Sequence, residues 1–286
     1  MRRILLTIEF HGGSFFGWQR QGAARTVQST LEEAVRDLVG HEATMHSSGR
    51  TDRGVHALAM AAHVDLDSRL DPASIMMALN ARLPQDCKVR RAQEVDPRFH
   101  ARFDALSKLY RYSFVLGRAP SPLLADRACH MPRPLDVSAM AHAARLLMGR
   151  HDFACFESSS DETGDDDGLD ITADRFGPAA LASGHSAPPP WRKPRPRGSV
   201  RNLMALEVRR VGRLVQIEAS ADGFLRGMVR GIAGTLAQVG LGRQEPAWVL
   251  QVLASRDRRK AGANMPAEGL TLVRVVYPPE ALKWPL

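Results

Sequence analysis

The stretch "SSGRTDRGVHA", residues 47–57, sets Asp52 between two arginines and places a glycine on either side of them. It lies between two apolar runs, residues 43–49 and 58–66, that are predicted to be strands. Aspartate and glycine suit the backbone geometry of turns, so one interpretation is a plain surface turn with solvated arginines. The other is a functional loop, because loops held by a rigid scaffold often carry catalytic residues. The rest of the chain decides between the two.

Strand and helix patterns alternate through residues 1–104. Apolar and β-branched residues predict strands at 2–10, 43–49, 58–66 and 87–95. Apolar residues at helical spacing predict a helix at 26–40. A second predicted helix, at 71–84, has Asp71 as its cap and Pro84 as its stop. The order of these segments is βαββαβ.

Residues 105–286 repeat this order loosely. Strands are predicted at 108–117, at 200–221 as a pair that turns at Gly212, and at 270–278, and helices at 136–149, 224–240 and 246–255. The sequence therefore predicts an α+β protein of two ferredoxin-like βαββαβ halves, with a mainly antiparallel sheet and helices on one face. It leaves open whether the two sheets join.

The charge of the chain is strongly positive, with a formal net of +8. Seven of its 31 acidic residues lie in one window, residues 161–174, which contains no base. The other residues hold 39 bases against 24 acids, a net of +15. Such a balance favours a polyanionic partner through phosphate neutralisation, although a merely basic globular protein would have the same composition.

The three cysteines, Cys87, Cys129 and Cys155, lie far apart and include no CxxC pair. This usage is typical of a reducing compartment and indicates neither a disulfide framework nor a zinc site. No apolar run reaches the length of a membrane span, and Glu9 and His11 interrupt the first residues too soon for a signal peptide. We therefore expect a cytoplasmic protein without a bound metal.

Aromatic residues alternate with bases in "FHARF" (99–103) and "SKLYRYSF" (107–114). Such alternation can stack a nucleobase while contacting phosphate, although in a strand it more often marks one packed face. A third stretch, "FLRGMVRGIAG" (224–234), is predicted to place Arg226 and Arg230 on one helical face. An arginine there needs an anionic partner if it turns inward, and reaches solvent if it does not.

Taken together, these stretches resemble the TruA family of tRNA pseudouridine synthases over almost the whole chain. Eight stretches occur in the family's order and at its spacing: "GWQRQ" (17–21), "TVQSTLEEA" (26–34), "GRTDRGVHA" (49–57), "LNARLP" (79–84), "FHARF" (99–103), "KLYRY" (108–112), "FLRGMVRGIAG" (224–234) and "EGLTLVRVVYP" (268–278). The third is highly specific, and it decides against the plain turn. The resemblance implies isomerisation of uridine to pseudouridine in the anticodon stem-loop of tRNA, at nucleotides 38–40, without a cofactor.

The resemblance also implies roles for matching residues. Asp52 matches an aspartate that either attacks C1′ of the ribose or removes a proton from C2′, and the sequence does not choose between them. Arg230 matches its basic partner, which favours the ionised carboxylate. Tyr110 matches the residue that stacks on uracil, and Arg50 the arginine associated with extruding the target nucleotide. An RNA-contacting stretch matches Phe99, His100, Ala101 and Arg102.

Three positions depart from the family's pattern. Arg53 stands where members usually carry alanine or lysine, and Gly227 and Gly231 replace a histidine and an asparagine near Arg230. Two glycines inside the predicted helix would cost about 1 kcal/mol each relative to alanine. The resemblance further implies a homodimer that holds tRNA in a basic cleft.

Residues 158–199 have no counterpart in the common family pattern, which has a shorter loop there. Serine, aspartate, glycine and proline dominate the segment, which predicts a mobile insert. Its acidic front is followed by a basic back that contains Arg192, Lys193, Arg195 and Arg197. The two ends could pair with each other, the acidic end could cover basic surface until tRNA displaces it, or the insert could be a spacer without a role.

Two other functions stay open at the level of sequence. A pseudouridine synthase that acts on other RNA positions would carry the same residues, because none of them encodes the target nucleotide. A catalytically idle RNA-binding protein on the same fold is the second. The joint presence of Asp52, Tyr110 and Arg230 weighs against idleness.

Overall fold

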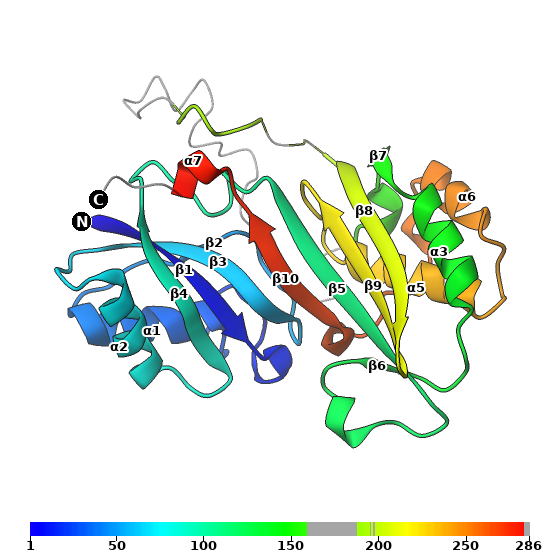
Figure 1. Ribbon diagram of the computed structural model, residues 1–286, viewed down its shortest axis with the longest axis horizontal. Helices are drawn as coiled ribbons and strands as arrows, with labels where there is room; N and C mark the ends of the chain where they lie inside the picture. The colour runs from blue at the N-terminus through cyan, green and yellow to red at the C-terminus, as the bar shows by residue number, and fades with distance from the viewer. Residues whose placement is uncertain (159–187, 195, 197, 283–286) are drawn as a thin grey trace.

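The computed structural model describes residues 1–158, 188–194, 196 and 198–282 (Figure 1). Its strands are β1 (Arg2–Phe10), β2 (His46–Ser47), β3 (His56–Leu66), β4 (Cys87–Val95), β5 (Ser107–Leu116), β6 (Cys129–Met131), β7 (Gly149–Asp152), β8 (Val200–Val211), β9 (Leu214–Ala221) and β10 (Leu270–Val276). They form one sheet in the order β4-β1-β3-β10-β5-β9-β8-β7, with β2 beside β3 and β6 beside β5. Most pairs are antiparallel, and β10–β3 and β5–β6 are parallel. The predicted α+β class is confirmed, and the two predicted sheets are one.

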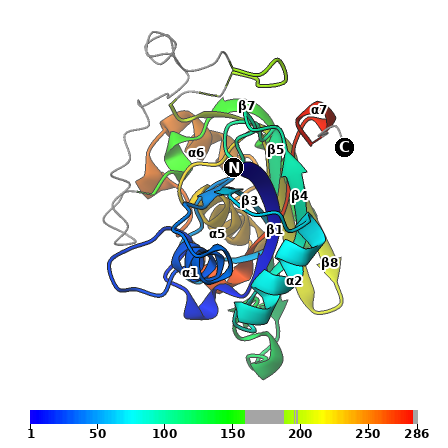
Figure 2. The same cartoon turned by 90° about the vertical axis from the view of Figure 1, so that its left-hand side faces the viewer.

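The helices of the described ranges are α1 (Val27–Val39), α2 (Pro72–Arg82), α3 (Val137–Leu146), α5 (Met228–Gly240), α6 (Trp248–Ser255) and α7 (Pro279–Leu282). Side-chain caps begin the first two, because Thr26 accepts a hydrogen bond from the Ser29 amide and Asp71 caps α2 in the same way. Figure 2 shows α1 and α5 on the same side of the sheet. None of these helices is both long and apolar enough to cross a lipid bilayer.

Both halves of the sheet place their strands in the same order. The order β4-β1-β3-β2 in the first half corresponds to β10-β5-β9-β8 in the second. The halves meet where β10 pairs with β3, through Thr271–His56 and Leu272–Ala57. Because β10 also pairs with β5, Leu272 is the register partner of both Ala57 and Tyr110. One strand therefore separates the start of β3 from the middle of β5.

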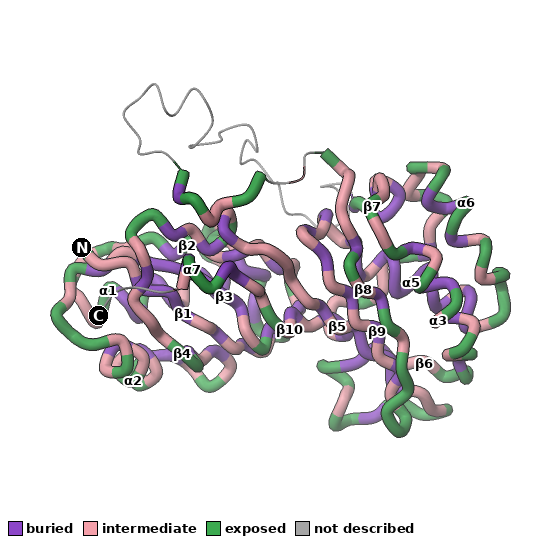
Figure 3. Tube along the Cα trace, turned by 45° about the horizontal axis from the view of Figure 1, so that its top comes forward, coloured by how far each residue is buried: buried purple, intermediate pink, exposed green. Residues whose placement is uncertain are grey.

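Buried side chains cover both faces of the first half of the sheet. In β1, Ile4 and Leu6 belong to a large cluster that includes Leu31 of α1, whereas Leu5 belongs to a smaller cluster with Ala281 of α7. This division follows from the two-residue period of a strand, which sends successive side chains to opposite faces. Figure 3 shows buried positions in both halves, among them those of β3 and α5.

Some predicted boundaries differ from the structure. The helix predicted at 224–240 begins at Met228, because Gly227 before it has a φ of +67°, in the left-handed region. The prediction that Arg226 and Arg230 share a helical face is therefore wrong, since Arg226 precedes the helix. For the same reason Gly227 carries no helix-interior cost. The strand predicted at 43–49 is reduced to β2, and the short strands β6 and β7 were not predicted.

The predicted mobile insert lies outside the described residues at 159–187, 195 and 197, but its tail at 188–194 is described. This tail packs on the loop that follows β4. Arg192 forms an ion pair with Asp104, and the two side chains are only 8% and 0% exposed. Arg192 also donates a hydrogen bond to the carbonyl oxygen of Arg98 at 2.8 Å. Arg192 therefore takes part in a buried ion pair within the protein.

Arg192→Met leaves the buried carboxylate of Asp104 without its cation, so we expect the free energy of unfolding to fall by about 3 to 5 kcal/mol. The double variant Arg192→Met/Asp104→Asn should recover part of this loss, because a neutral amide can still accept the hydrogen bond that Asp104 accepts from the His100 amide. Denaturant unfolding measures both values. Lys193→Met, at an exposed neighbour, is the control. A double variant no more stable than Arg192→Met would contradict this account.

The loop that follows β4 is also held by a buried histidine of β3. The Ala101 amide donates to Nδ1 of His63 at 3.1 Å, and the Ala101 carbonyl oxygen accepts from the Tyr277 hydroxyl at 2.6 Å. Nδ1 can accept only when it carries no proton. Burial lowers the pKa of His63, and the neighbouring His100 adds to this effect. Burial also lowers the pKa of His100 to about 3. The hydrogen bond that holds this loop therefore requires the neutral form of His63.

The lowered pKa of His63 predicts a pH-dependent stability. In the unfolded chain this histidine takes up a proton near pH 6.5, and in the folded protein it does not, so the free energy of unfolding falls as the pH falls below about 6.5. His63→Asn keeps an acceptor for the Ala101 amide but cannot titrate. We expect the variant to lose up to about 1.4 kcal/mol per pH unit of this dependence between pH 6.5 and pH 5, as measured by urea unfolding. An unchanged pH dependence would exclude the buried histidine as its source.

Candidate active site

The loop that carries Asp52 is fixed by a turn at residues 15–18 that packs against its backbone. The Trp18 amide donates to the carbonyl oxygen of Thr51 at 3.0 Å. Gly17 beside it has a φ of +81°, and a Cβ at this position would lie 2.6 Å from the same oxygen. Glycine is required there both for its conformation and for the close approach. The loop then closes before β3, where the Asp52 carbonyl oxygen accepts from the Val55 amide at 3.2 Å.

Asp52 meets Arg230, which lies 178 residues further along the chain in the first turn of α5. Nη1 of the arginine donates to Oδ2 of the aspartate at 3.2 Å. The two side chains are 14% and 21% exposed, so the ion pair is half-buried yet open to solvent at one side. Removing either partner from such a site leaves the other charge poorly compensated. The pair joins one residue from each half of the sheet.

The guanidinium of Arg230 is held in place by the segment at residues 262–266. Its Nε donates to the Met265 carbonyl oxygen at 2.7 Å, and the Met265 amide donates back to the Arg230 carbonyl oxygen at 3.2 Å. The segment approaches α5 closely because position 234 is glycine, and a Cβ there would overlap the carbonyl oxygen of Ala263. With one nitrogen fixed to backbone, the arginine presents another to Asp52.

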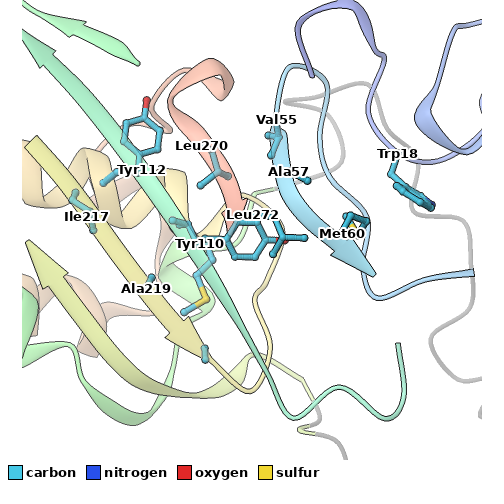
Figure 4. Packing of buried hydrophobic residues seen from close by; sticks show 14 of the residues in the cluster. Trp18, Val55, Ala57, Met60, Tyr110, Tyr112, Ile217, Ala219, Leu270 and Leu272 are labelled. Carbon is cyan, nitrogen blue, oxygen red and sulfur yellow. The ribbon is translucent and has the colours of Figure 1, made fainter. Parts of the chain in front are cut away.

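Tyr110 projects from β5 beside Leu272 of β10, its partner in the strand register (Figure 4). Its ring packs edge-on against Phe224, with the ring centres 5.1 Å apart. The residue is 8% exposed. Burial raises the pKa of its hydroxyl, and the negative charge of Asp52 raises it further. The structure thus gathers Asp52, Arg230 and Tyr110 at the junction of the two halves, and the tyrosine keeps its proton at neutral pH.

Arg50 lies in the same loop as Asp52, two residues before it, and is partly buried. The stretch from Phe99 to Arg102 lies beside β2 and β3, the strands that lead into and out of this loop. The Ala101 amide donates to Nδ1 of His63 on β3, and the His100 ring centre is 5.7 Å from that of His46 on β2. Phe99 and Ala101 are both 0% exposed and His100 is partly buried, so Arg102 is the exposed residue of this stretch.

The two glycines that depart from the family's pattern leave room for other side chains. A Cβ at Gly227 would overlap Oγ of Ser158, the first residue of the predicted insert. Ser158 Oγ accepts a hydrogen bond from Nδ2 of Asn264 at 2.6 Å. A Cβ at Gly231 would lie 3.3 Å from Oδ1 of the same asparagine. Glycines at the N-cap and in the first turn of α5 thus leave room for Ser158 and Asn264 near Arg230.

Sequence reasoning missed two parts of the site. The Met265 carbonyl oxygen is a backbone atom, which gives no signal in a sequence. Phe224 is the first residue of the stretch that contains Arg230, and its contact with Tyr110 depends on the packing of a turn against β5. The sequence signal that could have identified Phe224 as a site residue is its place in the same motif as Arg230, directly before Leu225 and Arg226.

A half-buried carboxylate beside a fixed guanidinium and a buried tyrosine can act on a bound ring or sugar as a nucleophile or as a base. Across the described part of the chain, no three histidine, cysteine, aspartate or glutamate side chains gather as metal ligands would.

Comparison with known proteins identifies the family to which this chain belongs. The sequence profile of a family described as tRNA pseudouridine synthase matches residues 6–104 and 191–278. Three proteins named tRNA pseudouridine synthase A are similar over nearly the whole length. The chain is 42% identical to the one from Thermus thermophilus, with 99% of each chain covered. It is 39% identical to that from Methylobacterium nodulans, with 100% of each covered. It is 38% identical to that from Acetivibrio thermocellus, with 97% of this chain and 100% of the relative covered. Both matched regions include residues of the site, Asp52 in the first and Arg230 in the second, and this chain belongs to the tRNA pseudouridine synthase family.

Proposed function

We propose that this protein isomerises uridine to pseudouridine in the anticodon stem-loop of tRNA, at nucleotides 38–40. The observation that carries the proposal is the Asp52–Arg230 ion pair beside Tyr110, at the junction of the two halves. Family membership supports the reaction and tRNA as the substrate. Mapping pseudouridine in tRNA from cells with and without this protein identifies the target nucleotides.

The reaction breaks the N1–C1′ glycosidic bond, turns the uracil and joins its C5 to C1′. The C5 proton leaves and N1 gains one, so atoms balance without an oxidant, a reductant or a cofactor. Asp52 is the group we assign to the sugar, either as a nucleophile at C1′ or as a base at C2′. Arg230 stabilises the negative charge of that carboxylate at 3.2 Å.

Tyr110 is the group we assign to the uracil. Its ring is already packed on one edge by Phe224, so it offers a fixed surface on which a flat base can stack. Arg50 is assigned to the extrusion of the nucleotide from the RNA, because it shares the loop of Asp52. Arg102 and the loop around it are assigned to a second RNA contact, beside β2 and β3.

The proposal extends to how the molecule is organised. Two ferredoxin-like halves, residues 1–104 and 105–286, would form a basic cleft for tRNA, and two copies would form a homodimer in the cytoplasm. The repeated strand order supports the two halves. The positive charge outside the acidic window supports a polyanionic ligand for the cleft. The resemblance to the family supports the homodimer.

Asp52→Asn keeps the shape of the side chain but removes its charge and its nucleophilic oxygen. We expect pseudouridine formation by the purified variant to fall to the level of a reaction without enzyme, while tRNA still binds. The control is Asp67→Asn, at an exposed aspartate beyond the far end of β3. Measurable turnover by Asp52→Asn above the background would remove Asp52 from the chemistry.

Arg230→Met separates a partner of the carboxylate from an ordinary RNA contact. We expect turnover at saturating tRNA to fall about a hundredfold, because the developing charges lose a fixed cation. The affinity for tRNA should change far less. If affinity and its salt dependence fell together while turnover at saturation held, Arg230 would be a phosphate contact and nothing more.

The same measurements discriminate the alternatives. A synthase that acts on other RNA positions would turn over a different RNA and still depend on Asp52. An idle RNA-binding protein would bind tRNA equally well with and without the Asp52 carboxylate and form no pseudouridine with either.

A further inference from the structure

An exposed arginine and an exposed aromatic ring lie against each other next to Asp52. The guanidinium carbon of Arg53 is 4.2 Å from the centre of the Phe16 ring. Phe16 is 44% exposed, and Arg53 is exposed as well. The backbones that carry them are held together, since Gly17 directly follows Phe16 and a Cβ at Gly17 would lie only 3.3 Å from the backbone nitrogen of Arg53. The Phe16–Arg53 pair is therefore a fixed feature of the surface beside the site.

Neighbouring arginines on the same turn already have carboxylate partners. Arg20 pairs with Glu32 at 2.6 Å, and Arg25 pairs with Asp86 at 2.7 Å. Arg53 differs from both. Among the residues that the structure describes, no carboxylate pairs with Arg53, and its recorded contact is with an aromatic ring.

The contact with Phe16 leaves the hydrogen-bond donors of Arg53 available. A guanidinium that stacks on a ring is held by one flat face, and its N–H groups point outward from the edge of the plane. The fork of N–H groups matches the oxygens of a phosphate and can bind two of them at once. A positive charge with fixed orientation and no carboxylate partner among the described residues is suited to an anionic ligand.

We propose that Arg53, held on the Phe16 ring, binds a backbone phosphate of the RNA next to the uridine that enters the Asp52 site. The inference rests on the proposed function and adds a residue to it. A nucleotide that leaves the stack turns about its backbone, so its flanking phosphates stay at the mouth of the site. Arg53 directly follows Asp52 in the chain, with the two Cα atoms about 3.8 Å apart, so its side chain begins next to the site.

The test uses Asp52→Asn as the parent, so that binding is measured without turnover. The dissociation constant for tRNA is determined from about 50 to 200 mM salt. Adding Arg53→Gln should weaken binding about fivefold at low salt and lower the slope of log Kd against log salt by about 0.7 to 0.9, the loss of one phosphate contact. Arg53→Lys should keep the slope. Arg69→Gln, at an exposed arginine beyond the other end of β3, is the matched control and should change neither quantity.

A second variant tests the ring. Phe16→Leu keeps the charge of Arg53 but removes the surface that orients it, so we expect about threefold weaker binding with the parent slope. If Arg53→Gln keeps the parent slope, Arg53 binds no phosphate and the inference is overturned. If Arg53→Gln weakens binding at an unchanged slope, Arg53 stacks on a base instead, which also overturns the inference.

Turnover of the same tRNA keeps this result separate from the proposed function. In the chain with Asp52 intact, Arg53→Gln should raise KM and leave turnover at saturation unchanged. If the intact chain forms no pseudouridine but the slope still depends on Arg53, the proposed function fails and the phosphate contact stands. If pseudouridine forms and the slope is independent of Arg53, the function stands and the phosphate contact fails.

Discussion

The pairing of β10 with β3 is the interaction on which the site depends. Two register pairs join the halves of the sheet, and His56 reinforces them from one side. Its Nδ1 accepts from the Gly12 amide at 3.0 Å, which leaves its Nε2 to donate to the Glu268 carbonyl oxygen at 3.2 Å. Burial lowers the pKa of His56, so the neutral ring can do both. A histidine at the start of β3 thus connects the two halves beside the Asp52 loop.

This junction explains how residues so far apart in the sequence come to lie together. β10 pairs with β5 on one side and with β3 on the other. Only this one strand therefore separates Tyr110 of β5 from the start of β3. The segment just before β10 then holds Arg230 through the Met265 carbonyl oxygen. The carboxylate, the cation and the aromatic ring therefore depend on one edge-to-edge contact, and the rest of each half provides the rigid support that keeps their geometry.

The arginines of this protein differ in function according to what surrounds them. Arg192 is buried against Asp104 and holds a loop, and Arg230 is half-buried against Asp52 at the site. Arg53 is exposed on an aromatic ring. A net charge counts these three alike, yet the first is used for structure, the second is assigned to chemistry and the third to binding. The solvent exposure and the partner of each guanidinium make the difference.

The sequence by itself determined most of the secondary structure, because its signals are local. The caps at Thr26 and Asp71 and the two-residue alternation in β1 act within a few residues of the chain. Through a motif resemblance, the sequence also predicted Asp52 and Arg230 as residues of the site. Only the tertiary structure decided that the two sheets are one, that α5 begins after Gly227 and that Phe99 and Ala101 are buried. These features depend on contacts between residues distant in the chain, such as the Ser158 side chain beside Gly227 and the β10–β3 pairing, and no local pattern encodes a contact of that kind.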